Sequence, residues 1–248
     1  MNKHERDEMT EELEGNLTRK GELARQRILE SALRLFGSRG YEETTMREIA
    51  AEAGYSPGLT YRYFSSKEEL VLVLYQNLDK ELDKYTHELP PTLLAERFRL
   101  TLSQQFALIA PHRDVFSALF GTTLNLRSKA GVFGASTAEV RRRARKSYLR
   151  VIQGAKDAPR EAQREDLATV LYGAHMALVL FWLIDQSKNA VRTQLFLALL
   201  CDVLKLVQPV LWLLPIRRSL ARLATIIGPL LGDERYEDKD QQDDEVSL

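Results

Sequence analysis

The helical spacing of apolar residues is the feature of this sequence that most restricts its fold. Between residues 21 and 39, apolar residues recur at steps of three and four, which places them on one stripe of a helix. They are Ala24, Ile28, Leu29, Ala32, Leu35 and Phe36. The chain shows no alternating strand pattern of useful length, and glycine and proline are few, at 13 and 8 of 248 residues. The sequence therefore predicts an all-α protein.

Charge and cysteine content exclude several classes of protein. Lysine and arginine total 35, as do aspartate and glutamate, so the formal net charge is zero. Bulk charge alone does not bind nucleic acid in such a chain, although a local basic face remains open. Cys201 is the single cysteine, which excludes an internal disulfide framework and a Cys-based zinc cluster. The four histidines are scattered, so we expect neither a metal site nor a cofactor.

Acidic residues collect at both ends of the chain. Residues 1–14 hold six acidic and two basic residues, and residues 233–248 hold eight acidic and two basic residues. We predict disordered acidic tails over 1–20 and 233–248. Between Arg19 and Lys67, by contrast, nine basic residues face six acidic ones, so a basic segment lies between the acidic ends.

Turn residues divide the rest of the chain into two helical regions. Pro90 and Pro91 separate them. Beyond these prolines we predict helices at about 92–109, 112–124, 135–156, 161–186, 190–213 and 216–231. The amino terminus lacks the apolar core of a signal peptide. The longest apolar run, Met176–Ile184, is nine residues long and too short to span a bilayer, so we expect no membrane segment and a cytoplasmic location.

Two short helices with a tight turn between them are predicted over residues 45–64. In the first, apolar residues share one face at steps of three and four: Met46, Ile49, Ala50 and Ala53. Gly54 supplies the positive φ that the turn requires. Ser56 is a good N-cap and Pro57 suits the first position of the second helix. This is the layout of a helix-turn-helix, whose second helix lays its amino-terminal end in the major groove of DNA.

The residues around the second helix suit contact with DNA. Ser56 and Gly58 keep its amino-terminal end narrow, and Gly58 lets the backbone approach DNA. Tyr61 and Tyr63 carry hydroxyls on long, stiff side chains that reach phosphate oxygens. Lys67, at the start of the next helix, neutralises a phosphate. The sequence alone leaves open that the tyrosines pack between helices, that Arg47 pairs with Glu43, and that Lys67 is solvated.

Residues 22–82 resemble the DNA-binding domain of the TetR family of bacterial transcriptional repressors. The resemblance rests on the ordered motifs Phe-Gly-x-x-Gly at 36–40, Thr-x-x-x-Ile-Ala at 45–50, Ala-Gly at 53–54, Ser-x-Gly at 56–58, Tyr-Arg-Tyr-Phe at 61–64 and Ser-Lys-Glu-Glu-Leu at 66–70. It covers about a quarter of the chain. It implies an N-terminal three-helix helix-turn-helix domain over 21–86 and a C-terminal helical bundle over 87–232 that binds an effector and dimerises.

The resemblance also implies roles for single residues. Thr45 would cap the first motif helix and touch a phosphate, and Arg47 would point to the groove or to a phosphate. Four residues would form the groove-facing edge of the recognition helix: Ser56, Pro57, Gly58 and Leu59. Tyr61 and Lys67 would clamp phosphates, with Tyr63 at the base or backbone surface. The departure from the family pattern is Thr60, which stands where the family has Ile, Leu or Val. Its hydroxyl needs a partner if it is buried, and Leu59 offers bases only an apolar contact, for example with a thymine methyl.

The second region carries two predictions that rest on its apolar helices. A homodimer, as a palindromic operator in double-stranded DNA demands, would use Leu167, Leu171, Ala174, Leu178, Leu199 and Val203. A small-molecule effector would lie among Phe106, Phe116, Phe120, Phe133, Tyr148, Tyr172, His175 and Trp182. Either set could instead belong to an ordinary buried core. The basic run from Arg141 to Arg150 is typical of a solvated helix face, and could instead be a site for an anionic effector.

Three function classes are open to an all-α chain of this length. The residues favour a DNA-binding regulator, most simply a repressor that leaves its operator when a largely apolar effector binds; an activator of the same family has the same motifs. An enzyme is not expected, because the sequence has no Gly-rich phosphate loop, no His-x-x-x-His pair and no activated nucleophile. The third class is a helical adaptor that binds protein without binding DNA.

Overall fold

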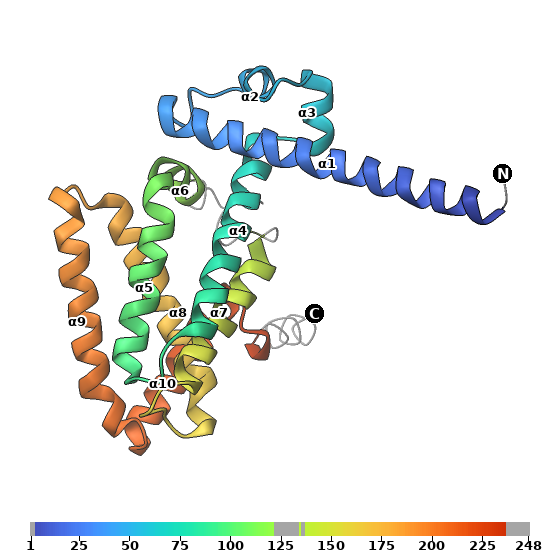
Figure 1. Cartoon of the computed structure of the whole chain (residues 1–248). Coiled ribbons are helices and arrows are strands. Elements are labelled where there is room, and N and C mark those ends of the chain that lie inside the picture. The colour runs from blue at the N-terminus through green and yellow to red at the C-terminus, as the bar shows by residue number, and fades with distance from the viewer. Residues whose placement is uncertain (1–2, 122–133, 135–136, 237–248) are drawn as a thin grey trace, which may run out of the picture. The chain divides into compact units, whose positions relative to one another are not determined.

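The computed structural model describes residues 3–121, 134 and 137–236. Over these residues the chain is helical and contains no strand, which confirms the all-α prediction. The helices are α1 (Lys3–Arg39), α2 (Met46–Ala53), α3 (Pro57–Tyr63), α4 (Lys67–Glu88), α5 (Leu94–Ile109), α6 (Arg113–Gly121), α7 (Ala138–Gln153), α8 (Glu161–Ile184), α9 (Val191–Val207) and α10 (Leu214–Ile227) (Figure 1).

The chain divides into two compact units within helix α4. Unit 1 comprises residues 1–74 and unit 2 comprises residues 75–248. The sequence places this boundary between residues 86 and 87, at the end of the same helix. The difference arises because α4 is one continuous helix whose first two turns pack with α1 to α3 and whose remainder packs with unit 2.

Unit 1 is built on a small apolar core. Helix α1 packs against α2, and α2 packs against α3. Five large side chains from α1 to the start of α4 are fully buried there: Ile28, Phe36, Ile49, Phe64 and Leu70. Burial of this kind stabilises by about 1.5–3 kcal/mol for each large apolar side chain. The short α2 and α3 are therefore held in place by the stripe of α1.

The structure carries α1 back to Lys3, where the sequence analysis places a disordered tail over residues 1–20. The physical reason is helix propensity. Residues 3–20 contain no proline and are rich in Glu, Leu, Met, Lys and Arg, which are all good helix formers. The helix of unit 1 therefore continues toward the amino terminus as far as Lys3.

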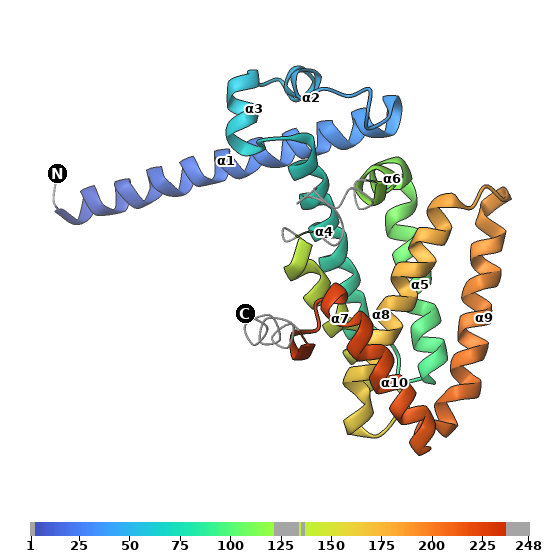
Figure 2. The ribbon, with the colours of Figure 1, turned by 180° about the vertical axis from the view of Figure 1, so that it is seen from behind.

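Unit 2 is organised around α8. Helices α7 and α10 both pack against α8, while α5 packs against α9 and α7 (Figures 1 and 2). By length and composition alone α8 is apolar enough to cross a membrane, and it is the one described helix that passes this test. More than half of its apolar window is buried inside the unit, at 56%. This burial is what a central core helix shows.

The predicted C-terminal tail begins later than the sequence suggests. Asp233 is fully buried, and its carboxylate accepts a hydrogen bond of 2.6 Å from the hydroxyl of Thr169 on α8. Arg235 donates to Asp233 and to Asp166. A buried hydroxyl needs a partner, and Asp233 provides one, so residues 233–236 pack on α8. Residues 237–248 lie outside the described residues.

The basic run on α7 is bound internally. Arg143 lies 3.4 Å from Asp79, Arg145 lies 2.7 Å from Glu165, and Arg150 pairs with Asp83. Arg142 pairs with Glu139 and Glu234, and Arg141 donates to the carbonyl of Gly134 and to the Thr137 hydroxyl. The run is therefore not the solvated helix face expected from the sequence. Four of its arginines tie α7 to α4, α8 and the C-terminal segment, and Arg141 bonds to residues just before α7.

Burial of the Asp79 carboxylate near Arg143 predicts how the stability of the protein depends on pH. An unfolded aspartate ionises at a pH of about 4, whereas burial raises the pKa of Asp79 in the folded chain to about 7, against the opposing effect of Arg143. Between these values the folded state holds a proton that the unfolded state has lost, so this group makes stability fall as the pH rises. Asp79→Asn should remove this decrease in stability with rising pH, because asparagine does not ionise.

Urea unfolding of both proteins from pH 5 to pH 8 tests this expectation. The free energy of unfolding of Asp79→Asn relative to the unmodified protein should rise across the range by at least about 1 kcal/mol. Burial lowers the pKa of His175 to about 4, which gives stability the opposite slope below a pH of about 6.5. That slope is common to both proteins and cancels in the difference. A difference that does not change with pH would contradict the assignment to Asp79.

Candidate nucleic-acid interface

Helix α2 has the capped, one-sided form that the sequence predicts. The Thr45 hydroxyl accepts a hydrogen bond from the backbone N–H of Glu48, while the Glu48 carboxylate accepts one of 2.8 Å from the backbone N–H of Thr45. This reciprocal pair is a capping box. The predicted apolar face is confirmed, since Met46, Ile49, Ala50 and Ala53 are buried. Gly54 ends the helix at φ 75°, in the left-handed region that glycine adopts without strain.

Helix α3 begins as expected and resolves the question raised by Thr60. Ser56 is the N-cap and its hydroxyl accepts a 3.2 Å hydrogen bond from the N–H of Leu59, with Pro57 at the first position. Thr60 is fully buried, and its hydroxyl donates to the carbonyl of Ser56 at 3.2 Å. A hydroxyl bonded to the carbonyl four residues back carries no unsatisfied donor into the core. The departure from the family pattern therefore leaves the helix intact.

The outward face of α3 is narrow at one end and polar at the other. Ser56, Pro57 and Gly58 are exposed, and a Cβ placed on Gly58 would meet no atom within 4 Å. Tyr61 is 49% exposed and Arg62 beside it is also exposed, so Tyr61 does not pack between helices. The first turn of α3 offers backbone to a partner, and the last turn offers a hydroxyl and a guanidinium.

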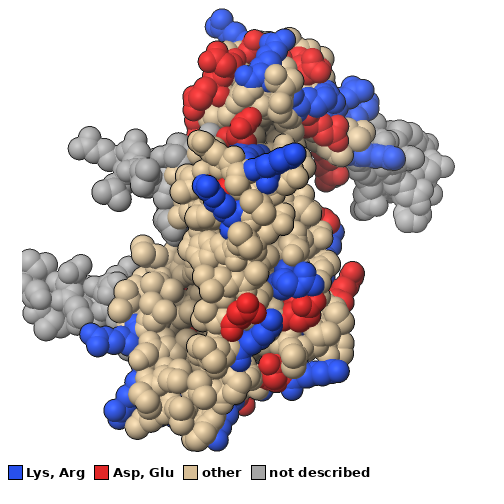
Figure 3. Space-filling view, turned by 90° about the vertical axis from the view of Figure 1, so that its left-hand side faces the viewer, with Lys and Arg blue, Asp and Glu red and all other residues tan. Residues whose placement is uncertain are grey.

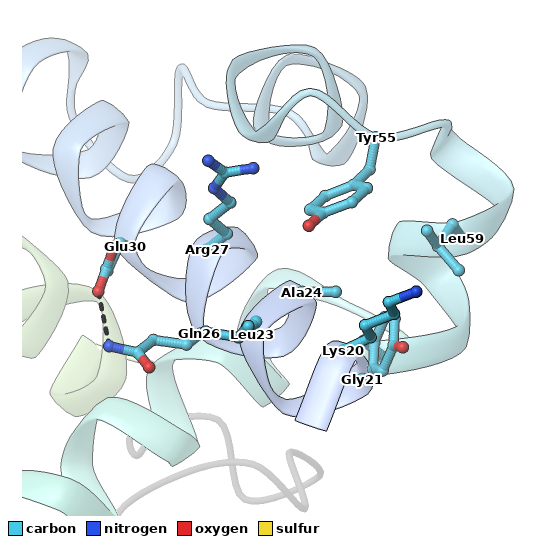
Figure 4. Close-up of a pocket in the computed structure, with 10 residues that line it drawn as sticks. Lys20, Gly21, Leu23, Ala24, Gln26, Arg27, Glu30, Tyr55 and Leu59 are labelled. Carbon is cyan, nitrogen blue, oxygen red and sulfur yellow. Dashed lines mark hydrogen bonds between the residues drawn. The ribbon is translucent and has the colours of Figure 1, made fainter. Parts of the chain in front are cut away.

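Two residues assigned to DNA contact point elsewhere. Leu59 and Tyr63 are half-buried, and both line a hollow of about 780 Å³ between α1 and the α2–α3 pair (Figure 4). Four residues apart on a helix, they share one face. That face turns toward α1, where a Cβ on Gly21 would lie 3.4 Å from the Tyr63 hydroxyl. Leu59 therefore lies on a half-buried face beside Lys20 and Arg27, and its contact with a base stays a prediction.

Lys67 is a tether within unit 1 rather than a free cation. Its ammonium donates to the backbone carbonyls of Tyr41 at 2.8 Å and Glu42 at 3.4 Å. It also lies 4.4 Å from the centre of the Tyr41 ring. These contacts fix the start of α4 to the turn that follows α1. Lys67 thus has a structural role in unit 1, and its contact with a phosphate stays a prediction.

The remaining basic residues of unit 1 fall into two groups. Arg34 and Arg39 pair with acidic residues of α2, at 3.4 Å from Glu52 and 3.1 Å from Glu48. Within the described part of the chain, by contrast, no ion pair joins a carboxylate to any member of a second group, which includes Lys20, Arg27, Arg47 and Arg62. The proposed Arg47–Glu43 pair is thus not formed. Lys20 and Arg27 line the hollow together with Tyr55.

Sequence reasoning missed four residues of this surface: Lys20, Arg27, Tyr55 and Arg62. Lys20 and Arg27 lie on α1, and Tyr55 lies in the turn between α2 and α3. The excess of basic residues between Arg19 and Lys67 was the available signal. This excess indicates a positively charged surface. Spacing along the chain does not show which of the basic residues form ion pairs with acidic neighbours.

The aromatic residues predicted to form an effector pocket separate into two sets. Phe106 and Trp182 line a cavity of about 440 Å³ in unit 2. The other described members are buried in the core and do not line this cavity: Phe116, Phe120, Tyr148, Tyr172 and His175. Tyr148, Tyr172 and His175 contact one another, with ring centres 5.6–6.0 Å apart. Phe133 lies outside the described residues.

The predicted dimer residues separate in the same way. Leu167, Leu171 and Leu178 are buried within the protomer, so they have no surface to offer to a second chain. Their helix, α8, is covered by α7 and α10, and a Cβ on Gly173 would lie 3.0 Å from Ile227 of α10. The close approach of another helix to α8 at Gly173 is therefore made by α10 of the same chain. Ala174 is half-buried, whereas Leu199 and Val203 on α9 are exposed.

Two short helices joined at a left-handed glycine, with the second presenting an open amino-terminal end, define unit 1 as a helix-turn-helix domain. Residues 28–74 match the family model of bacterial regulatory proteins of the tetR family. Over these residues the chain carries a DNA-binding domain similar to that of tetR-family regulators.

Curated relatives agree with this assignment. The regulator HbdR of Aromatoleum sp. (strain CIB) is 32% identical over 109 residues, which cover 42% of this chain and 46% of HbdR. The regulator BetI of Brucella canis is 39% identical over 62 residues, 25% of this chain and 31% of BetI. Both are named as HTH-type transcriptional regulators. The matched part of this chain spans less than half the length of either relative.

Solved structures extend the likeness beyond unit 1. A tetR-family transcriptional regulator from Streptomyces coelicolor is 26% identical, with a TM-score of 0.53 over 81% of this chain and 89% of that one. A TetR transcriptional regulator from Rhodococcus sp. RHA1 is 19% identical, with a TM-score of 0.55 over 76% and 98%. At that lower identity the second match shows the fold alone. The two-part helical architecture is thus that of TetR-family structures.

Gly58 gives a prediction that separates folding from DNA binding. Because open space surrounds Gly58 and alanine is the better helix former, Gly58→Ala should stabilise the fold by up to about 1 kcal/mol. The added methyl group stands on the exposed edge of α3 and should weaken DNA binding. Gly37→Ala in α1 is the matched control, because its Cβ also meets nothing within 4 Å. Thermal unfolding and fluorescence anisotropy with a labelled duplex should show weaker DNA binding for Gly58→Ala only; equal affinities would refute the close approach.

Proposed function

We propose that this protein is a sequence-specific, DNA-binding transcriptional regulator that acts as a homodimeric repressor and leaves its operator when a small, largely apolar effector binds. The observation that carries the proposal is the exposed edge of α3, where Gly58 and Tyr61 stand open to solvent. The proposal places the protein in the cytoplasm, where its operator would be, and assigns it no enzymatic reaction.

In the proposed complex the two ends of α3 contact different parts of the DNA. The Pro57–Gly58 end enters the major groove, since Gly58 adds no side chain to its width. The Tyr61 hydroxyl and the Arg62 guanidinium meet phosphate oxygens on the strand beside the groove. Lys20 and Arg27 extend the same positive surface along α1, and each phosphate they neutralise steepens the salt dependence of binding.

The proposed dimer uses a stripe of exposed apolar residues on α9, which we call the α9 stripe. It consists of Val191, Leu195, Leu199, Val203 and Leu206. The side of unit 2 that carries α9 shows a broad area without charged residues (Figure 3). Helix α8 packs on α9 and leaves Leu180 and Ile184 exposed as well. Two such helices from each chain would form a four-helix interface, which corrects the predicted interface by replacing the buried leucines of α8.

The test is binding to a duplex from the promoter beside the protein's own gene. We expect sequence-selective binding that weakens as salt rises, with log K falling linearly with log salt concentration. Tyr61→Ala should weaken binding to every duplex, since a phosphate contact carries no sequence information. Tyr85→Ala, on the unit 2 part of α4, is the control. Salt-independent binding, or no preference for this duplex over a scrambled one, would refute the proposal.

A further inference from the structure

Unit 2 contains a cavity that the recognition surface does not use. It has a volume of about 440 Å³ and lies between α5, the end of α8 and the start of α9. Phe106, Trp182 and Leu197 give it apolar walls, while Ser103 and Gln194 add polar groups. Pockets for small molecules have volumes of about 300–1,000 Å³ and this same mixture of apolar walls with a few polar groups.

The aromatic wall of the cavity is held rigidly. Phe106 and Trp182 pack with ring centres 5.8 Å apart. The guanidinium of Arg113 lies 5.0 Å from the centre of the Trp182 ring. The same guanidinium donates to the carbonyls of Trp182 at 2.7 Å and Asp185 at 2.6 Å, at the C-terminal end of α8. The Trp182 ring is therefore fixed, as a flat wall for stacking requires.

The backbone at the rim of the cavity is strained. Asn189 and Ala190, which both line it, have φ of 55° and 51°, and among the described residues they are the non-glycine residues with positive φ. Such a conformation persists only where the surroundings impose it, and it is typical of ligand sites. Here Asp185 imposes it, because its carboxylate accepts hydrogen bonds from the hydroxyls of Ser187 at 2.6 Å and Thr193 at 2.7 Å.

The charges around the cavity select a neutral occupant. Arg99 is the charged residue among those that line it, and its guanidinium forms two hydrogen bonds, of 2.6 and 2.9 Å, with the carboxylate of Glu96. The lining therefore carries no uncompensated charge. The Thr193 hydroxyl is committed to Asp185, and the Gln194 amide nitrogen donates to the Asn189 carbonyl at 3.2 Å. The Ser103 hydroxyl, the Gln194 amide oxygen and the Asn189 side chain are left to orient a ligand.

We propose that this cavity binds a neutral, planar aromatic molecule that stacks on Phe106 and Trp182 and bonds to Ser103 or Gln194. The inference rests on the proposed function, in which this molecule is the effector. Helix α9 forms one wall of the cavity and also carries the α9 stripe. A ligand that moves α9 would therefore act on the proposed dimer interface and so on the spacing of the two recognition helices.

The two tryptophans of the chain allow a direct test with the neutral fluorophore N-phenyl-1-naphthylamine. Trp212→Phe leaves Trp182 as the single tryptophan. In this background, excitation of tryptophan should give saturable energy transfer to the probe, with one probe bound per chain. Ala198 is exposed and lines the cavity, so Ala198→Phe should fill it and weaken probe binding at least about ten-fold.

The control is Ala107→Phe, at an exposed position of α5 that does not line the cavity, which should leave probe binding unchanged. Transfer that does not saturate, or equal probe affinity of the two phenylalanine variants, would overturn the inference. Operator binding without the probe is measured for the same proteins. If Ala198→Phe binds the operator normally while the probe result is negative, the cavity assignment fails and the proposed function stands. If the unmodified protein binds no operator, the proposed function fails instead.

Discussion

Leu199→Asp should make the protein a monomer that binds its operator at least about a hundred-fold more weakly. Leu199 lies at the middle of the α9 stripe and is 58% exposed in the single chain. In a monomer the new carboxylate stays in water and the fold is unaffected. In a dimer it is buried without a partner, which costs several kcal/mol. A monomer holds a single recognition helix and loses about half of the phosphate contacts that a palindromic site offers.

Light scattering coupled to size-exclusion chromatography, together with anisotropy on the operator duplex, measures both effects. Leu93→Asp is the matched control, because Leu93 is 54% exposed and lies at the start of α5, away from the α9 stripe. It should remain dimeric and bind normally. A dimeric Leu199→Asp protein with normal operator affinity would show that the α9 stripe is not the interface.

Arg97→Ala should destabilise the protein by about 2–5 kcal/mol, because two buried carbonyls lose a charged hydrogen-bond donor. Arg97 is 4% exposed, and its guanidinium donates to four backbone carbonyls. Two belong to Arg150 and Val151 in the last turn of α7, and two belong to Leu89 and Pro90 after α4. The carbonyls of Arg150 and Pro90 also accept hydrogen bonds from the backbone N–H groups of Gly154 and Thr92, at 3.1 and 2.9 Å. Without Arg97, the buried carbonyls of Leu89 and Val151 would lose their donor.

Urea unfolding followed by circular dichroism measures this loss. Arg99→Ala is the control two residues along α5, because Arg99 forms an exposed pair with Glu96 and such pairs contribute about 0–1 kcal/mol. Gly154→Ala should destabilise through the same site, since its Cβ would lie 2.5 Å from the Arg97 guanidinium. Equal unfolding free energies for Arg97→Ala and Arg99→Ala would show that the carbonyls of Leu89 and Val151 find other partners.

The sequence predicts the parts of unit 1 that local rules determine. The threonine cap, the left-handed glycine, and Ser56 followed by Pro57 each act within a few residues, and the structure shows all of them. The roles of Leu59, Tyr63 and Lys67 depend instead on what packs against them from α1 and the turn after it. No spacing along the chain contains that information, so the sequence does not predict the contacts that these three residues make within unit 1.

The same limit explains the second region. Helical spacing shows that Leu167 and Leu199 each belong to an apolar stripe, but it does not show which stripe is covered inside the protomer. The structure decides this, because α7 and α10 cover α8 and leave α9 open. The sequence does not predict the ion pairs of the basic run on α7 for a related reason. Its acidic partners on α4 and α8 lie far away in the sequence, and only the fold brings them together.

Selection of binding sites from random double-stranded DNA by the full-length protein tests the central claim most directly. That claim is that α3 reads DNA in the major groove, twice in each dimer. We expect enrichment of a two-fold symmetric site whose half-sites lie about 34–36 Å apart, one helical turn or a multiple of it, and we expect Gly58→Ala, on the edge of α3 that faces the groove, to reduce the enrichment. Enrichment of no sequence, or an enriched site that Gly58→Ala selects equally well, would contradict the account.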